Sequence, residues 1–425
     1  MLSMQILFYL FAYSWATCAR AQRTGKNWAV LVAGSNGWYN YRHQADIAHA
    51  YQLLRGNGIP AENIITMMYD DIAFNPRNHF PGKLFNDYDH EDVYEGVKID
   101  YRGVFVTPNM FIRVLEGDEE LKAAGKKVLD SEADDNLFIF FSDHGGENLI
   151  SFPNGVLYSQ QLVNALKRLK HLNRFKHAAV YIEACYSGSI FEGVLSKDID
   201  VYATSASNSN ESSYASFCQD VLLDTCLADH YSYSWMKDTA SSDLNKKTLS
   251  EQFRAVRRAV NRSHVCEWGS ESVGKRPIGE FQSHNSSKVY TNKKMFKFMR
   301  TADQEPAHKA HLVGIMRTLM NSNDEKERAS AQKRLHRALQ LERLVIETCD
   351  EIVATIMDKL VPNNIPRAKE EQLDCYKTIF DAFQIKCFTI NQVPEVARQT
   401  PKFGKLCREG YDAANMVHVI HDVCV

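Results

Sequence analysis

Residues 178–189 read Ala178-Ala179-Val180-Tyr181-Ile182-Glu183-Ala184-Cys185-Tyr186-Ser187-Gly188-Ser189. The first half is rich in β-branched and aromatic residues, and small residues follow abruptly on either side of Cys185. This pattern predicts a buried strand that leaves its sheet in a tight turn. In open α/β folds the carboxyl edge of the sheet is where ligands bind. Cys185 is therefore a candidate for a reactive thiol.

A second segment has the same form, because the apolar residues 136–142 run directly into Asp143-His144-Gly145-Gly146. If the two strands are neighbours, the imidazole of His144 can activate the thiol of Cys185, and glycine N–H groups can approach an oxyanion. Taken singly, a cysteine after a buried strand is more often a core residue, and such a histidine can simply end a strand. A metal site is the other reading of Asp-His-Gly-Gly-Glu, but no second ligand set with useful spacing accompanies it. The pair together predicts a Cys/His hydrolase with no metal and no cofactor.

Strand and helix patterns alternate along the first two thirds of the chain. Thr107 is expected to cap a helix that begins at Pro108, and Ser159 to cap a later one. Strands are expected at 27–34, 62–69, 136–142, 178–183 and 199–203, and helices at 44–55, 107–115, from 159, 231–236 and 249–260. This order predicts an α/β fold with a mostly parallel sheet and helices on both faces.

Composition limits the class and the compartment. The 425 residues have a net charge of −2 and are 24% charged, so neither a nucleic-acid footprint nor a basic membrane patch is evident. Residues 1–21 resemble a signal peptide, with an apolar run at 6–16 and a small-residue site at 19–21; the alternative is a buried amino-terminal strand. No later run approaches the ~20 apolar residues of a transmembrane helix. Ten cysteines and the sequons at Asn210, Asn261 and Asn285 suit the secretory pathway.

The chain changes character near its carboxyl end. We expect a catalytic domain over 22–283, a polar linker over 284–323 and an all-helical domain over 324–425. Within the long helical segment an apolar stripe is predicted, formed by Leu335, Leu339, Ile346, Val353 and Met357. Four cysteines cluster near the end and allow three connectivities, and two more lie eight residues apart: Cys375, Cys387, Cys407, Cys424, Cys218 and Cys226. Cys185, Cys266 and Cys349 have no evident partner.

From residue 27 to its end the chain resembles the legumains, the asparaginyl endopeptidases. The similar blocks are co-linear: 32–46, 67–73, 142–145, 181–185, 211–214 and 319–321. The resemblance implies a caspase-like α/β fold, synthesis as a zymogen, and cleavage after asparagine, and more weakly after aspartate in acid. It also implies an acidic endosomal or lysosomal compartment, or secretion, for instance into a gut lumen.

The same resemblance assigns roles residue by residue. Cys185 matches the nucleophile, His144 the general acid/base, and Asn40 the residue that orients the histidine, while the N–H groups of Gly145 and Cys185 match the oxyanion hole. The S1 pocket, which holds the side chain before the cleaved bond, matches Arg42, His43, Glu183, Ser212 and Asp229. An asparagine amide has one acceptor oxygen and two N–H donors, so a donor such as Arg42 and two acceptor carboxylates suit it. Without the family, a surface ion pair between Arg42 and Asp229 is the simpler reading. Asp143 is implied as a site of succinimide formation.

The resemblance further implies that the helical domain is a prodomain that covers the active site, with Cys375 joined to Cys407 and Cys387 to Cys424. Asparagine cleavage at Asn323, or nearby at Asn321, would release it, and protonation of carboxylates in acid would weaken its interface. The alternative is a permanent helical domain with an ordinary turn at 321–324. Expected partners are protein and peptide substrates and the chain's own prodomain, and the family is compatible with cystatin-type inhibitors.

One position departs from the family, since Tyr186 stands where an acidic residue usually follows the nucleophile. A carboxylate there would oppose ionisation of the thiol, so the pH optimum is in question. Two alternative functions stay open. A subunit like that of a glycosylphosphatidylinositol transamidase would need a membrane anchor near its end, and a binding protein on a dead protease scaffold would not need Cys185, His144 and Asn40.

Overall fold

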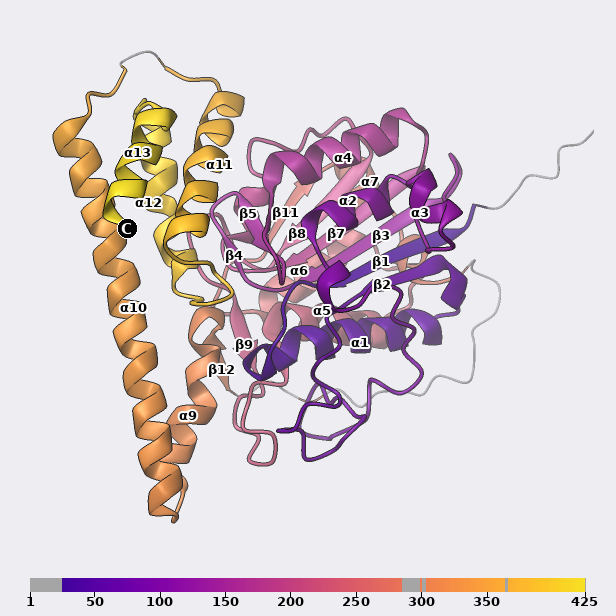
Figure 1. The fold of residues 1–425 in the computed structure, drawn as a ribbon. Helices are drawn as coiled ribbons and strands as arrows, with labels where there is room; N and C mark the ends of the chain where they lie inside the picture. Colours follow the sequence, from indigo (N-terminus) through magenta and orange to yellow (C-terminus); the bar gives the residue numbers. More distant parts are fainter. Residues whose placement is uncertain (1–24, 285–298, 300–302, 364–365, 425) are drawn as a thin grey trace, which may run out of the picture.

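The computed structural model describes residues 25–284, 299, 303–363 and 366–424. The expected signal peptide and the sequon at Asn285 lie outside the described residues. A six-stranded sheet has the order β11–β8–β7–β3–β1–β2, and only β11 runs antiparallel to its neighbour (Figure 1). These strands are β1 (Asn27–Ala33), β2 (Ile64–Met67), β3 (Asn136–Ser142), β7 (His177–Glu183), β8 (Val201–Ser205) and β11 (Cys266–Gly269).

Side chains alternate between the two faces of the sheet, as a strand requires. Val30 and Val32 pack with helices α2 (Pro108–Leu115) and α4 (Ser159–His171), while Ala29 and Leu31 pack with helices on the other face. Those helices are α1 (Tyr41–Gly56), α5 (His230–Ser241) and α6 (Leu249–Ala259). The predicted α/β class, with a mostly parallel sheet covered on both faces, is confirmed.

The two helix caps predicted from the sequence have different outcomes. Thr107 caps α2 as predicted, because its side chain accepts a 3.1 Å hydrogen bond from the N–H of Met110 and Pro108 follows it. The predicted cap at Ser159 is wrong. Ser159 is the first residue of α4, and Gln161 instead reaches back to accept from the N–H of Tyr158 at 3.0 Å.

The carboxyl-terminal part is helical and lies beside the sheet domain (Figure 1), and its core also includes Leu149, Val156 and Tyr158 of that domain. Its helices are α10 (Glu325–Lys359), α11 (Lys369–Lys386), α12 (Val396–Arg408) and α13 (Ala413–Val423). Disulfides join Cys375 to Cys407 and Cys387 to Cys424, the pairing that the resemblance implied, and a third joins Cys218 to Cys226 in the sheet domain. Among the described residues, none of the helices has the length and apolar character needed to cross a bilayer.

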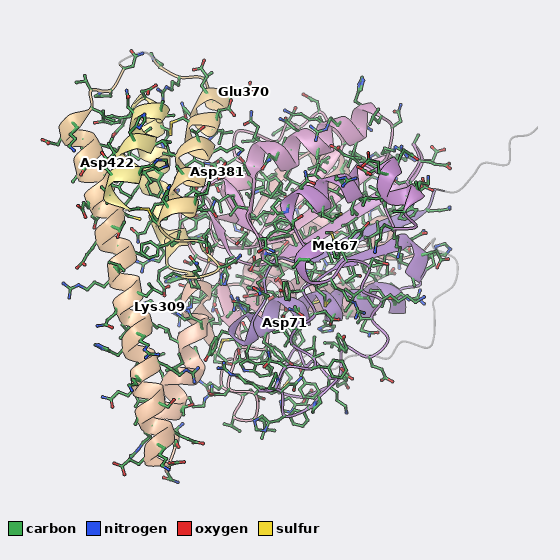
Figure 2. All side chains as sticks on the ribbon, viewed as in Figure 1. Met67, Asp71, Lys309, Glu370, Asp381 and Asp422 are labelled. Carbon is green, nitrogen blue, oxygen red and sulfur yellow. A yellow bond between two sulfur atoms is a disulfide. The ribbon has the colours of Figure 1, made fainter. Side chains whose placement is uncertain are left out.

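The apolar stripe predicted for α10 is only partly correct, since Val353 packs against the helical core but the fully buried residues are others. The buried residues are Ala331, Val345, Cys349, Ile352 and Ile356, whereas Leu339 and Met357 are exposed. Part of the range expected as a linker is ordered, as strand β12 (Gln304–Pro306) and helix α9 (Ala310–Asn321). Figure 2 shows the side chains that fill the space between the two parts, with Asp381 of α11 and Lys309 before α9 labelled along the boundary.

Candidate active site

Strands β3 and β7 bring the two predicted catalytic residues to one edge of the sheet. The strands are parallel neighbours in which Ser142 pairs with Glu183, so His144 and Cys185 each stand two residues beyond a matched pair. Gly145 lies against the backbone of the next strand, because a Cβ added there would be 2.6 Å from the carbonyl oxygen of Cys185. Any side chain at 145 would push the two strand ends apart.

The His144 ring is oriented by Asn40. Nε2 of His144 lies 2.9 Å from Oδ1 of Asn40, while Nδ2 of Asn40 donates to the carbonyl of Asn36 at 3.0 Å. Because the amide nitrogen of Asn40 is used there, its oxygen faces the ring and accepts from Nε2–H. This arrangement favours the tautomer whose Nδ1 is free to accept a proton.

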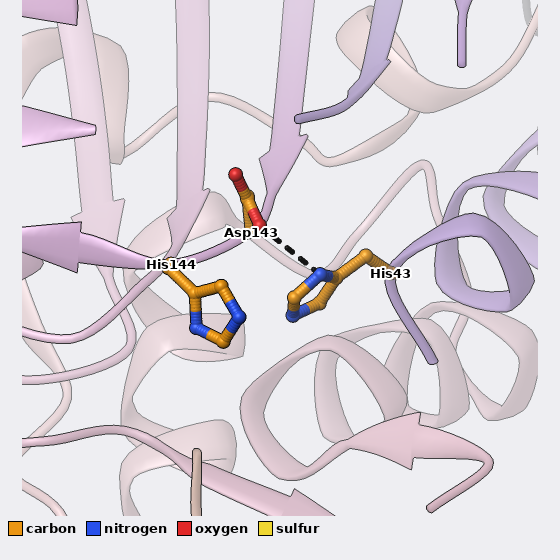
Figure 3. Close-up of side chains that lie close together, drawn as sticks. All are labelled: His43, Asp143 and His144. Atoms are coloured by element: carbon orange, nitrogen blue, oxygen red, sulfur yellow. Dashed lines mark ion pairs between the residues drawn. The ribbon is translucent and has the colours of Figure 1, made fainter. Parts of the chain in front are cut away.

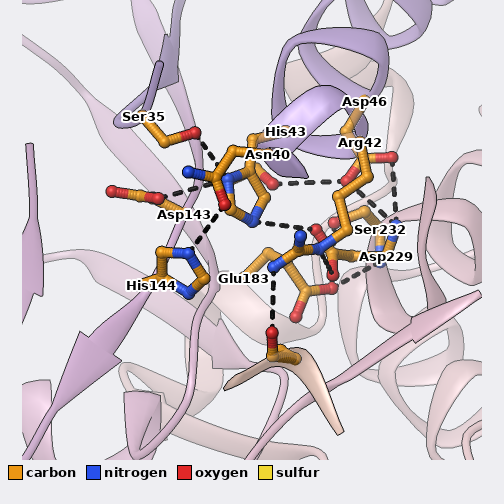
Figure 4. A network of polar contacts seen from close by, with 12 residues as sticks. Ser35, Asn40, Arg42, His43, Asp46, Asp143, His144, Glu183, Asp229 and Ser232 are labelled. Atoms are coloured by element: carbon orange, nitrogen blue, oxygen red, sulfur yellow. Dashed lines mark hydrogen bonds and ion pairs between the residues drawn. The ribbon is translucent and has the colours of Figure 1, made fainter. Parts of the chain in front are cut away.

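Arg42 and Asp229 form a buried ion pair, so the reading as a surface pair is wrong. Nε of Arg42 lies 2.9 Å from Oδ1 of Asp229, and each side chain is 1% exposed (Figure 4). Glu183 accepts from the N–H and the hydroxyl of Ser232 through Oε2, both at 3.0 Å. Its other oxygen is buried with no hydrogen-bond donor at normal distance in the described part of the chain. Burial raises the pKa of both carboxyls.

His43 links this pocket to the catalytic histidine. Its Nδ1 lies 2.7 Å from the hydroxyl of Ser35 and 3.2 Å from Oδ1 of Asp143, and its ring meets that of His144 edge-on at 5.1 Å (Figure 3). One donor atom each from His43, Asp143 and His144 lie within 4.8 Å of one another, close enough to hold a cation. Burial lowers the pKa of both imidazoles and raises that of Asp143.

Cys185 is buried, with Sγ 3.9 Å from the hydroxyl of Ser213. It packs against Tyr186 and against Ala307 of the segment before α9. Burial raises the pKa of the thiol, and the same effect keeps His144 neutral. Burial therefore favours an uncharged thiol and an uncharged imidazole in this covered state.

Comparison with known proteins decides the family. The model of the peptidase C13 family matches residues 27–284. The chain belongs to the peptidase C13 family. It is 42% identical to the hemoglobinase of Schistosoma japonicum over 93% of this chain and 92% of that protein. It is 38% identical to the legumain of Homo sapiens over 86% and 84%, and 35% identical to the vacuolar-processing enzyme beta-isozyme of Arabidopsis thaliana over 91% and 83%. The chain is thus a cysteine peptidase.

In this C13 peptidase a segment of the chain itself, residues 304–308, lies across the predicted catalytic and S1 residues. Strand β12 pairs antiparallel with β9 (Tyr214–Ser216), and the N–H of Ala307 donates to the carbonyl of Ser213 at 2.9 Å. The carbonyl of Ala307 accepts from Nη2 of Arg42 at 3.4 Å, and Nδ1 of His308 lies 2.9 Å from the hydroxyl of Ser212. Two of the expected S1 residues thus contact the covering segment.

The helical part contacts the loop that follows His144 in this C13 peptidase. The hydroxyl of Thr400 accepts a 2.8 Å hydrogen bond from the N–H of Glu147, three residues after His144. A Cβ on Gly146 would meet the same Thr400 side chain at 2.8 Å. The Glu147 carboxylate also pairs with Arg408, and the hydroxyl of Tyr158 donates to Asp381 at 2.6 Å.

Sequence reasoning missed Ser213, Ala307 and His308 as neighbours of the C13 site. Ala307 and His308 fall in a range whose polar composition predicted only a linker, and a strand of three residues leaves no periodic signal. The predicted processing residues lie at the end of α9 that is remote from β12 (Figure 1). Asn321 ends α9, Asn323 follows it, both are exposed, and Asp324 caps α10 by accepting from the N–H of Lys326 at 2.8 Å.

Proposed function

We propose that this C13 peptidase cleaves peptide bonds after asparagine, and more weakly after aspartate in acid. The observation that carries the proposal is the cluster of buried polar side chains near the end of the strand that leads to Cys185, where Arg42 can donate to an amide oxygen and Glu183 and Asp229 can accept from its NH₂. A substrate side chain that lacks either half of the amide would leave buried polar groups unpaired. Such a site discriminates strongly.

The reaction is acyl transfer. His144 takes the thiol proton, and the sulfur of Cys185 attacks the carbonyl carbon while N–H groups of Gly145 and Cys185 stabilise the oxyanion. The C–N bond then breaks, the departing amine takes the proton from His144, and a thioester remains. Water hydrolyses the thioester and regenerates the thiol. A peptide amine that replaces water would form a new peptide bond, which is ligase activity.

The chain is proposed to be a zymogen of the secretory pathway, active in an acidic compartment or after secretion. Two observations support latency: β12 and His308 lie across the S1 residues, and Thr400 lies against the loop after His144. Cleavage at Asn323 or Asn321 would cut the exposed link between α9 and α10, with protein substrates and cystatin-type inhibitors as later partners. Asn210 and Asn261 are exposed, as glycan acceptors must be. Asp143 is proposed as the succinimide site.

Peptides that differ only in the residue before a fluorophore test this specificity. After acid treatment the protein should turn over the asparagine peptide much faster than the aspartate peptide at pH 6, and the alanine peptide hardly at all. Cys185→Ala should abolish turnover, and Asp229→Asn should reduce the preference for asparagine. Equal rates for asparagine and alanine would refute the specificity. Turnover that survives in Cys185→Ala would refute the mechanism.

Amino-terminal sequencing of the acid-treated protein tests the zymogen proposal. A new terminus at Asp324 or Ser322 is expected, and Asn323→Gln should remove the first of these. An unchanged chain that is already active would favour a permanent helical domain. A chain that binds asparagine peptides without cleaving them would favour the inert scaffold. Transamidation of a glycolipid-linked amine without peptide hydrolysis would favour the transamidase-like alternative.

A further inference from the structure

The segment that crosses the active site is anchored at its far end by an aspartate. Asp303 directly precedes β12, and its Oδ2 accepts hydrogen bonds from the hydroxyl of Tyr88, at 2.9 Å, and from the backbone N–H of Cys218. Its other carboxylate oxygen is buried. Tyr88 and Cys218 both belong to the sheet domain, so the groups that bind this carboxylate stay with the catalytic domain when the linker is removed.

The two donors are held in place independently of Asp303. Phe217 has a positive φ of 54°, which turns the chain at the end of β9 and points the next N–H out of the strand ladder. The Cys218–Cys226 disulfide closes the loop that follows. The ring of Tyr88 meets Phe217 edge-on at 5.0 Å, and its hydroxyl accepts from the N–H of Gln219 at 2.8 Å, which aims its own proton at the carboxylate.

The pairing of β12 with β9 gives the number of residues between Asp303 and the part of the segment that lies beside Cys185. Glu305 pairs with Ala215 and Pro306 with Tyr214, and Ala307 follows with its N–H on Ser213, beside Cys185 and the S1 residues. If Ala307 stands where a substrate presents the residue before the cleaved bond, Asp303 stands four residues further upstream. The geometry points to a subsite, formed by Tyr88 and Cys218, that binds an acidic side chain at the fifth position before the scissile bond.

This inference rests on the proposed function, because it takes substrates to lie along β9 in the direction of β12. A carboxylate offers charged acceptors to the Tyr88 hydroxyl and the Cys218 N–H, whereas beside an alanine side chain these two donors would bind only water. An asparagine in that place can accept through one oxygen but carries no charge. The order expected for the fifth position is therefore aspartate, then asparagine, then alanine, with lysine last.

Two experiments test the subsite, and the first does not depend on activity. In the full chain with Cys185→Ala, hydrogen exchange at the amides of Glu305 and Ala307 should be roughly five- to tenfold faster in Asp303→Ala than in the parent. Tyr88→Phe keeps the ring contact with Phe217 and removes the hydroxyl, so it should have a smaller effect of the same kind. The double variant should be no faster than Asp303→Ala alone. Unchanged exchange in both single variants would overturn the assignment.

The second experiment uses peptides that end in asparagine and a fluorophore and differ only at the fifth position. At pH 6, above the ordinary aspartate pKa of about 3.9, kcat/KM should be about tenfold higher for aspartate than for alanine. Tyr88→Phe should reduce that ratio several-fold. Tyr94→Phe is the matched control, since its hydroxyl binds Asp70 in the same loop at 2.7 Å, and should keep the ratio.

The outcomes separate the two levels of the argument. Equal rates for aspartate and alanine peptides, or an aspartate preference that Tyr88→Phe does not reduce, would overturn the subsite while leaving cleavage after asparagine intact. Failure to cleave any asparagine peptide would overturn the proposed function. The exchange experiment would still decide whether Tyr88 and Cys218 bind an acidic side chain.

Discussion

Two histidines of the covering segment are expected to drive its release in acid. Burial lowers the pKa of His308 and of His311 to about 4, and nearby positive charges, including Arg398 and Lys309 beside His308 and Arg42 beside His311, add to the shift. His308 is 7% exposed and bonds the hydroxyl of Ser212, and His311 lies 3.7 Å from Glu395. A protonated imidazole is therefore disfavoured while the segment is docked.

The sign and the size of the pH effect on docking follow from the difference in histidine pKa between the docked and the released segment. A histidine with an ordinary pKa of about 6.5 when released and about 4 when docked favours docking above pH 6.5, and that contribution is lost as pH falls. Between pH 7 and pH 5 each histidine loses about 2 kcal/mol of docking free energy, a roughly 20-fold change in the opening equilibrium. Two such histidines give a change of a few hundred-fold if they act independently.

The carboxylates at the same interface act in the opposite direction. Burial raises the pKa of Glu395 to about 7 and also raises that of Glu147. Both groups bind protons more readily when docked, so a fall in pH favours the docked state through them. The release by carboxylate protonation expected from the sequence is therefore not supported by these two groups.

Labelling of Cys185 by an asparagine-directed covalent probe measures opening of the intact chain. Rates at each pH are divided by those of fully processed enzyme, which removes the pH dependence of the chemistry itself. His308→Asn and His311→Gln should each weaken the rise between pH 7 and pH 5 by about 20-fold. Wild-type pH dependence in both variants, together with its loss in Glu395→Gln, would refute the reasoning.

Two further predictions concern single positions. Tyr186→Glu should lower the ratio of activity at pH 7 to activity at pH 5.5, because an ionised carboxylate beside the thiolate opposes its formation; an unchanged pH–rate profile of processed enzyme would contradict this. In the Cys185→Ala background, Ile352→Ala should lower the free energy of unfolding of the helical part by about 2–5 kcal/mol, whereas Leu339→Ala, 47% exposed, should change it by less than about 0.5 kcal/mol. Urea unfolding measures the free energy of unfolding of both variants. Similar losses in Ile352→Ala and Leu339→Ala would contradict the assignment of Ile352 to the buried face of α10.

The sheet could be predicted because buried parallel strands are continuous apolar runs, and the runs ending at His144 and Cys185 are long and bounded by small residues. Helix α10 shows where this reasoning fails. Leu335, Leu339, Ile346, Val353 and Met357 have helical spacing, and Val353 does pack against the helical core. The buried stripe, however, runs through Val345, Cys349, Ile352 and Ile356, on a helix that contacts α12 and α13. A helix with apolar residues on more than one face does not state which face its partner will cover.

The predicted catalytic pair and the predicted S1 residues also differ in how far the sequence reveals them. A thiol and an imidazole at two strand ends follow from strand order alone, since parallel neighbours end at one edge. Arg42 and Asp229 do not. Removal of two charges from water costs several kcal/mol per ion before their attraction offsets it, so general rules place such a pair at the surface. Burial of this pair has that cost here, and the proposed recognition of a polar substrate side chain would account for it. Oε1 of Glu183 is likewise buried without a hydrogen-bond donor in the described part of the chain. Under the proposed function the substrate supplies that donor, so no pattern in the sequence alone marks the site.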